Sequence, residues 1–113
     1  MISIESYMHY YAKIVLKEWL QYDFLRIDIE HKLYFHGNTW LISDVVCLTE
    51  DGINTIYEIW HKCKLDHNRI NKYRIYMQDY FDYEYKFRLY EISAYWIMSQ
   101  ITKPKKLKCK LII

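Results

Sequence analysis

Glycine, proline and cysteine are scarce in this chain: its 113 residues include two glycines, one proline and three cysteines. Apolar residues make up 52% of the sequence, and such a chain can bury enough apolar surface to fold over most of its length. A chain of this size holds one domain with a modest core. We therefore expect a single domain over residues 1–102, followed by a basic C-terminal tail over residues 103–113.

Long apolar runs are also missing, since no segment approaches the roughly 18 residues of a membrane span. The opening MISIESYMHYY lacks the basic-then-apolar order of a secretory signal peptide. Cys47, Cys63 and Cys109 are odd in number and widely spaced, a pattern typical of reduced thiols. The abundance of Tyr, Ile, Lys and Asn is typical of an AT-rich genome, such as that of a large DNA virus or a low-GC bacterium. We expect an intracellular protein with no membrane partner, in a bacterial cytoplasm, a virus-infected host cell or a virion.

The net charge of +2 is unevenly distributed. Five of the 16 basic residues are lysines of the tail: Lys103, Lys105, Lys106, Lys108 and Lys110. Without them, 11 basic residues stand against 14 acidic ones. Because a non-specific nucleic-acid binder spreads its basic charge over a face, the overall charge supports nucleic-acid binding only weakly. The tail itself either contacts nucleic acid or only keeps the protein soluble.

Apolar periodicity predicts the order of the secondary-structure elements. In chain order we expect a helix over 4–21, a strand over 24–36, a hairpin over 39–64, a short helix or ordered loop over 65–72, a strand over 73–77 and a helix over 79–101. This order predicts an α/β fold with helices packed on a mixed sheet and a helix at the C-terminal end. The tail beyond Pro104 is expected to be loose, with the final LII as a segment that could dock on the domain.

The hairpin brings two carboxylates together. A turn at Asp51-Gly52 places position 44 opposite position 58 or 59, so Asp44 and Glu58 lie side by side on adjacent strands. Like charges on a buried surface need a cation or a shared proton, and carboxylate oxygens are what Mg²⁺ prefers. The alternative, which spacing alone favours, places both on the solvent face, each paired with a lysine or arginine on a neighbouring strand.

Three further patterns allow two interpretations each. His61, Cys63 and His67 suggest zinc, but a fourth ligand and a closely spaced cysteine pair are missing, which disfavours it. A basic segment either grips phosphates or forms a solvated face; its members are Lys62, Lys64, Arg69, Lys72 and Arg74. The tyrosines of residues 73–95 either stack on bases or form a core or dimer face. The latter is favoured, with a homo-oligomer formed through the aromatic C-terminal helix.

The first predicted helix resembles the opening of competence-protein CoiA-like nucleases, whose pattern is close to E-S-x-x-H-x-x-A-K-x-x-L-x-E-W-L. The matching residues are Glu5, Ser6, His9, Ala12, Lys13, Leu16, Glu18, Trp19 and Leu20. The segment IYEIWHKCKLDHNRINKY is also similar to the family, which has an E-I-x strand, a His- and Lys-rich stretch and an N-R pair. Here the matches are His61, Lys64, Asn68 and Arg69. The resemblance covers roughly residues 5–75.

These nucleases belong to the PD-(D/E)xK, or restriction-endonuclease-like, superfamily. The resemblance implies a nuclease-like domain with an αβββαβ core that cleaves DNA phosphodiester bonds with Mg²⁺ (or Mn²⁺). Asp44 and Glu58 would bind the metal, with Glu5 as an accessory acidic ligand. The third position of the E-x-K motif is Trp60, which cannot polarise a water. Lys62 is the candidate replacement as a catalytic cation, although its side chain has to reach back about 7 Å along the strand.

The nucleic-acid contacts that we predict from helix spacing, basic charge and the resemblance are His9, Lys13, Lys64, Arg69 and Lys72. His9 lies one helical turn from both Glu5 and Lys13, and it is either a packed residue or part of the site. Three functions remain open: a small metal-dependent nuclease, a catalytically inactive nuclease-fold module that binds nucleic acid or a protein, and a small viral structural or oligomeric protein. Trp60 is the residue that motivates the second.

Overall fold

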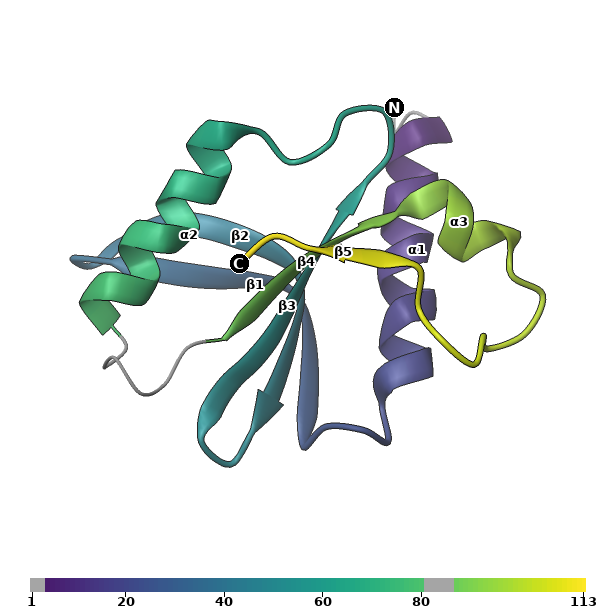
Figure 1. Cartoon of the computed structure of the whole chain (residues 1–113), viewed down its shortest axis with the longest axis horizontal. Coiled ribbons are helices and arrows are strands. Elements are labelled where there is room, and N and C mark those ends of the chain that lie inside the picture. Colours follow the sequence, from purple (N-terminus) through teal and green to yellow (C-terminus); the bar gives the residue numbers. More distant parts are fainter. Residues whose placement is uncertain (1–3, 81–86) are drawn as a thin grey trace.

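The computed structural model of the chain describes the backbone of residues 4–80 and 87–113, and the side chains of residues 7–78 and 87–113. The elements are α1 (Ile4–Leu20), β1 (Arg26–Phe35), β2 (Asn38–Thr49), β3 (Gly52–Trp60), α2 (His67–Tyr80), β4 (Arg88–Ser93), α3 (Ala94–Ser99) and β5 (Cys109–Leu111) (Figure 1). Within these described residues, no helix is both long enough and apolar enough to cross a membrane.

The five strands form one sheet in chain order, β1-β2-β3-β4-β5. The first two junctions and the last are antiparallel, whereas β3 and β4 run parallel. A parallel junction needs a long crossover, and here the connection that includes α2 provides it. The prediction of an α/β fold with helices on a mixed sheet is therefore confirmed.

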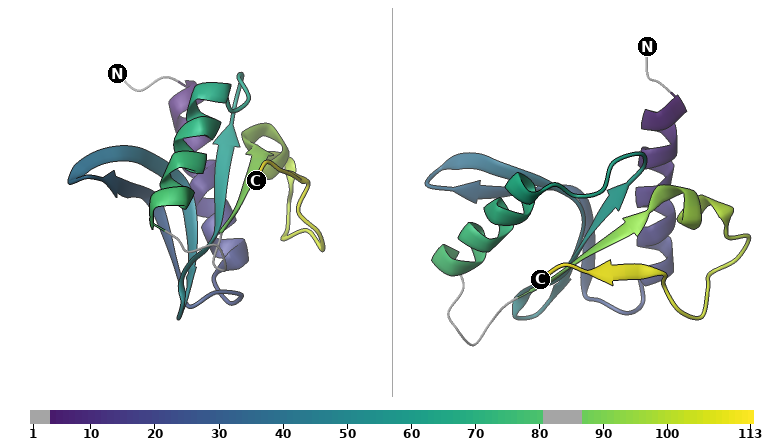
Figure 2. Two further views of the ribbon diagram at one scale, coloured as in Figure 1. Left: turned by 60° about the vertical axis from the view of Figure 1, so that its left-hand side comes forward. Right: turned by 45° about the horizontal axis from the view of Figure 1, so that its top comes forward.

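Two hydrophobic clusters cover opposite faces of this sheet. Residues next to each other on a strand point to opposite faces, and Val45 and Val46 of β2 belong to different clusters. The cluster that contains Val45 includes residues of α1 and α3, and the cluster that contains Val46 includes Tyr73 and Met77 of α2. Figure 2 shows α1 and α2 on either side of the strands.

The predicted strand over residues 73–77 is wrong, because these residues lie inside α2. Tyr73, Ile75 and Met77 alternate with polar residues as in a strand. Burial instead follows helical spacing: Tyr73 and Met77 are buried, and Ile75 is exposed. The predicted leading part of this region, a short helix or ordered loop over 65–72, contains the start of the same helix at His67.

The predicted helix over residues 79–101 is also wrong over most of its described length. Residues 79 and 80 end α2, residues 88–93 form β4 and residues 94–99 form α3, while residues 81–86 lie outside the described part. A short strand that is paired on both edges and buried has a mostly apolar sequence, and the periodicity of such a short run does not distinguish it from a buried helix. The predicted dimer face required one long aromatic helix over this region, and residues 88–93 form a strand instead.

The C-terminal tail is not loose at its end. Cys109–Leu111 form β5 against β4, and the amide of Leu89 donates to the carbonyl of Ile113 at 3.0 Å. The docking of the final LII segment is thus confirmed. Ile112 and Ile113 pack against the cluster that contains Val46, which explains why an otherwise basic tail is held on the sheet.

Candidate functional site

Asp44 and Glu58 meet where β2 and β3 begin to separate. The paired residues run from Thr49↔Gly52 to Val45↔Tyr57, with a one-residue register shift between Cys47 and Leu48. The shifted register, continued by one residue beyond Val45↔Tyr57, sets Asp44 opposite Glu58. Gly52 closes the turn with a φ of +111°, which a glycine adopts without steric cost. Asp44 and Glu58 are only 8% and 6% exposed. The solvent-face interpretation of the pair is therefore wrong.

Asp44 is held by one backbone amide and two cationic side chains. The amide of Ile59 donates to Oδ2 at 2.7 Å, and Lys13 Nζ lies 3.4 Å from Oδ1. His9 Nε2 lies 3.3 Å from Oδ2 and 2.9 Å from the carbonyl oxygen of Ile59. Since both of these neighbours are acceptors, His9 Nε2 carries the hydrogen. Burial alone would raise the pKa of Asp44, but its hydrogen bonds with His9 and Glu58 and the charge of His9 hold it below the ordinary value.

Lys13 is a buried lysine between two carboxylates. Its side chain is 8% exposed, and Nζ lies 3.2 Å from Oε1 of Glu30 as well as 3.4 Å from Asp44. Glu30 adopts a φ of 52°, the left-handed region that residues other than glycine seldom occupy. The residue with this unusual backbone conformation is thus the one that brings a second carboxylate to Lys13.

Glu58 is held from the other face of the sheet. Arg69 donates to Oε1 from Nη2 at 2.7 Å and from Nε at 3.2 Å, and the hydroxyl of Tyr73 donates to the same oxygen. Burial, followed by the negative charge of Asp44, raises the pKa of Glu58 to about 8. Burial and the charge of Asp44 therefore favour the protonated form of Glu58, whereas Arg69 and Tyr73 favour its ionised form.

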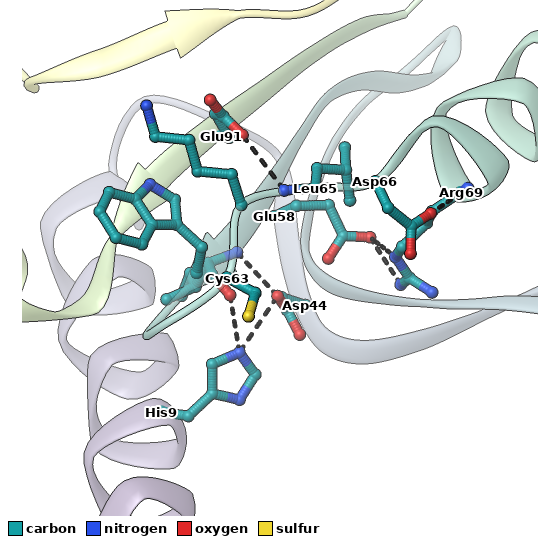
Figure 3. A pocket seen from close by; sticks show the side chains of 11 residues that line it. His9, Asp44, Glu58, Cys63, Leu65, Asp66, Arg69 and Glu91 are labelled. Carbon is teal, nitrogen blue, oxygen red and sulfur yellow. Dashed lines mark hydrogen bonds and ion pairs between the residues drawn. The ribbon is translucent and has the colours of Figure 1, made fainter.

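A pocket of about 280 Å³ opens over this pair (Figure 3). Its lining consists of His9, Asp44, Glu58, Ile59, Trp60, Cys63, Lys64, Leu65, Asp66, Arg69 and Glu91. In Figure 3, Asp44 turns toward His9, and Glu58 turns toward Arg69. The lining of this pocket thus combines four acidic side chains with Lys64, Arg69 and His9.

The donor set suits Mg²⁺ in part. Two adjacent carboxylates suit an ion that prefers oxygen ligands and keeps several waters. Among the described side chains, however, no group of three or more histidines, cysteines and acidic residues could hold a metal ion. Glu5, the predicted accessory ligand, belongs to α1, but its side chain is outside the described part. The guanidinium of Arg69 already forms an ion pair with Glu58, so a metal ion has to compete with it for this carboxylate.

The predicted contact residues fall into three groups. His9, Lys64 and Arg69 line the pocket, and Lys13 contacts Asp44 from α1. Lys72 lies elsewhere, with Nζ 4.6 Å from the centre of the Trp40 ring. The prediction that Lys62 lies on the same strand as Glu58 is wrong, because β3 ends at Trp60 and the chain bends just beyond it. Lys62 does not line the pocket.

Sequence reasoning missed Tyr73 as a partner of Glu58, and it missed Glu91. Glu91 is 4% exposed, and Oε2 accepts from the amide of Leu65 at 3.4 Å. A signal for it was present: the tripeptide Tyr-Glu-Ile occurs at 57–59 and again at 90–92. The two copies pair in register on the parallel strands β3 and β4, so Glu91 lies beside Glu58.

Comparisons of this chain with protein-family models, with curated protein sequences and with solved structures give no match. The geometry of the pocket therefore carries the functional argument.

Proposed function

We propose that this chain is a small metal-dependent nuclease of the PD-(D/E)xK type, which hydrolyses phosphodiester bonds of DNA. The observation that carries the proposal is the convergence of Asp44 and Glu58, both buried, in one pocket whose lining also includes Lys64 and Arg69. The order α1-β1-β2-β3-α2-β4 also agrees with the αβββαβ order of that superfamily, and this agreement supports the proposal.

In this proposal Asp44 and Glu58 hold Mg²⁺ (or Mn²⁺). The bound ion would activate a water and neutralise charge on the phosphate. Lys13 fixes the carboxylate of Asp44, and its burial keeps the ammonium close to it. Lys64 and Arg69 line the pocket as cations for phosphate oxygens. Lys13 and Arg69 thus supply the positive charge that the motif lacks at Trp60.

The test is a cleavage assay with end-labelled single-stranded and duplex DNA in Mg²⁺, in Mn²⁺ and in EDTA. We expect wild-type cleavage with either ion, and a loss of at least about a hundredfold in Asp44→Asn and Glu58→Gln. Glu50→Gln is the matched control, because it makes the same chemical change at an exposed carboxylate next to the hairpin turn. Full metal-dependent cleavage by Asp44→Asn and Glu58→Gln would refute the proposal.

A second candidate is a catalytically inactive module of the same fold that binds nucleic acid. Two observations favour it: Trp60 stands where the motif has a lysine, and Arg69 already lies 2.7 Å from Oε1 of Glu58. Binding of DNA by pure wild-type protein that shows no cleavage with either ion would select this candidate over the nuclease.

A further inference from the structure

A second pocket, of about 370 Å³, adjoins the first. Its lining consists of Trp60, Lys64, Glu91, Ile92, Ser93, Trp96, Lys108, Cys109 and Lys110. Trp60, Lys64 and Glu91 line both pockets, so the two hollows meet at these residues. A ligand that fills the second pocket therefore ends beside the carboxylate pair.

Two half-buried indole rings line this second pocket. Trp60 ends β3, and its ring lies 5.8 Å from Nζ of Lys64. Trp96 belongs to α3 and is braced by Trp19, whose ring it meets edge to face at a centre-to-centre distance of 6.1 Å. Rigid aromatic rings that keep part of their surface in a pocket are suited to stacking on a flat ligand.

Three exposed lysines share the lining with these rings: Lys64, Lys108 and Lys110. Lys110 lies on β5 opposite Glu91 of β4, so the sheet itself positions it. Glu91, the one acidic residue among the described residues of this lining, is 4% exposed and its Oε2 accepts from the backbone of Leu65, so a ligand in the pocket meets the lysines directly. The accessible charge of the pocket is therefore positive.

We infer that this second pocket binds a single-stranded nucleic acid, with unpaired bases on Trp60 and Trp96 and phosphates on Lys64, Lys108 and Lys110. Aromatic rings beside lysines favour single strands, because an unpaired base offers its face for stacking and a base within a duplex does not. Trp60 then has a use that a lysine could not fulfil. The inference that this strand is the substrate rests on the proposed nuclease function, whereas the binding itself does not.

The experiment measures the binding of fluorescent oligo(dT) by anisotropy, in EDTA so that no metal-dependent cleavage occurs. We expect single strands to bind at least about tenfold more tightly than a duplex of equal length. Trp60→Leu should weaken binding by about tenfold or more. Trp40→Leu is the matched control, since Trp40 also has a lysine over its ring but lines neither pocket. Its affinity should equal that of the wild type.

A second pair of variants tests the lysines. The double variant Lys108→Gln/Lys110→Gln should weaken binding and reduce the slope of log K against log salt by about 0.7 for each lost phosphate contact. The double variant Lys105→Gln/Lys106→Gln removes the same charge from exposed tail positions outside the pocket and should have the smaller effect. Equal losses in the two double variants would overturn the inference.

Two outcomes separate this inference from the proposed function. Binding that depends on Trp60, in a protein that cleaves nothing with Mg²⁺ or Mn²⁺, supports the pocket and defeats the nuclease. Cleavage that requires Asp44 and Glu58, together with unchanged affinity in Trp60→Leu, supports the nuclease and overturns the pocket. Equal affinity for duplex and single strands would also overturn it. Circular dichroism of each variant establishes that the fold is retained.

Discussion

Arg69 donates from Nη2 and Nε to a single oxygen of Glu58, at 2.7 and 3.2 Å. The same Nη2 donates to the carbonyl of Ile42 at 2.6 Å, so one guanidinium ties the first turn of α2 to both β2 and β3. Lys13 and His9 hold Asp44 from the opposite layer. Side chains from both helical layers thus reach the carboxylate pair. Lys13, His9 and Arg69 stabilise the pair, and Arg69 also competes with a metal ion for Glu58.

Replacing Arg69 should separate these two effects. Arg69→Met should destabilise the metal-free protein by about 1–3 kcal/mol, because it removes the partner of a buried carboxyl group. The loss is smaller than for a fully buried ion pair, since about a third of the arginine side chain is exposed to water, which screens the interaction. Mg²⁺ should then raise the melting temperature more in Arg69→Met than in the wild type, since the ion no longer competes with a guanidinium. Thermal melts with and without Mg²⁺ measure both effects, and an equal Mg²⁺ shift in the two proteins would contradict the competition.

Lys13 should be required for activity although it does not line the pocket. Lys13→Met keeps the length of the side chain and leaves Asp44 without its ammonium partner, so we expect about a hundredfold loss of DNA cleavage. Lys17→Met makes the same change on the exposed side of α1 and should cleave like the wild type. The measurement is the rate of DNA cleavage by Lys13→Met compared with that by Lys17→Met. Equal rates would show that Lys13 has no role in holding Asp44 for catalysis.

Part of this site could be predicted from sequence. The turn at Asp51-Gly52 predicts the hairpin, but its pairing continued without a break would set Asp44 opposite Tyr57; a one-residue register shift between Cys47 and Leu48 brings Glu58 opposite Asp44. The cation beside them could not be found in the same way. Lys62 is near Glu58 in the chain, but the strand ends at Trp60. The cations that do contact the pair, Lys13 and Arg69, come from helices on opposite faces of the sheet, and no local sequence pattern predicts that these helices bring them to the carboxylates.

The second half of the fold was harder to predict for a related reason. Residues 73–77 alternate like a strand although they lie in α2, and residues 88–93 fit a helical spacing although they form β4. The sequence pattern therefore predicts the wrong type of element for both segments. Parallel pairing of β3 with β4 decides their true conformations, and it joins residues that are about thirty positions apart in the chain. Local propensity is a weak guide wherever such long-range contacts dominate.

The stability of the metal-free protein should fall as the pH rises through neutrality. The pKa of Glu58 is raised from 4.5 to about 8 on folding, so its stabilising contribution is complete below pH 4.5 and is lost as the pH rises through 8. Asp44, whose pKa is lowered, behaves oppositely and loses its contribution only in acid, below 3.8. Glu58→Gln remains neutral and should remove most of the decline.

Urea unfolding from pH 5 to pH 9 in EDTA measures this dependence. The control is again Glu50→Gln, which should follow the wild-type curve because that carboxylate is exposed. An unaltered decline in Glu58→Gln would show that Glu58 is ionised throughout this range.

Tyr73 should contribute to the stability of the pair through its hydroxyl group. Tyr73→Phe removes the hydrogen bonds to Glu58 and to Ser43, the latter 2.7 Å long, and leaves the buried hydroxyl of Ser43 without the acceptor that Tyr73 provides. We expect a loss of about 1–3 kcal/mol in the free energy of unfolding. Tyr22→Phe is the control at an 89% exposed tyrosine and should change it by less than about 0.5 kcal/mol. Similar values for the two variants in urea unfolding would contradict a structural role of the hydroxyl.

The most direct test of the central claim is the anomalous scattering of crystals grown with Mn²⁺. The proposed function predicts a manganese peak between Asp44 and Glu58, at about 2.1 Å from a carboxylate oxygen of each residue, with Arg69 displaced from Glu58. Saturating Mn²⁺ that leaves the Arg69–Glu58 contact intact, with no peak at the carboxylate pair, would contradict it.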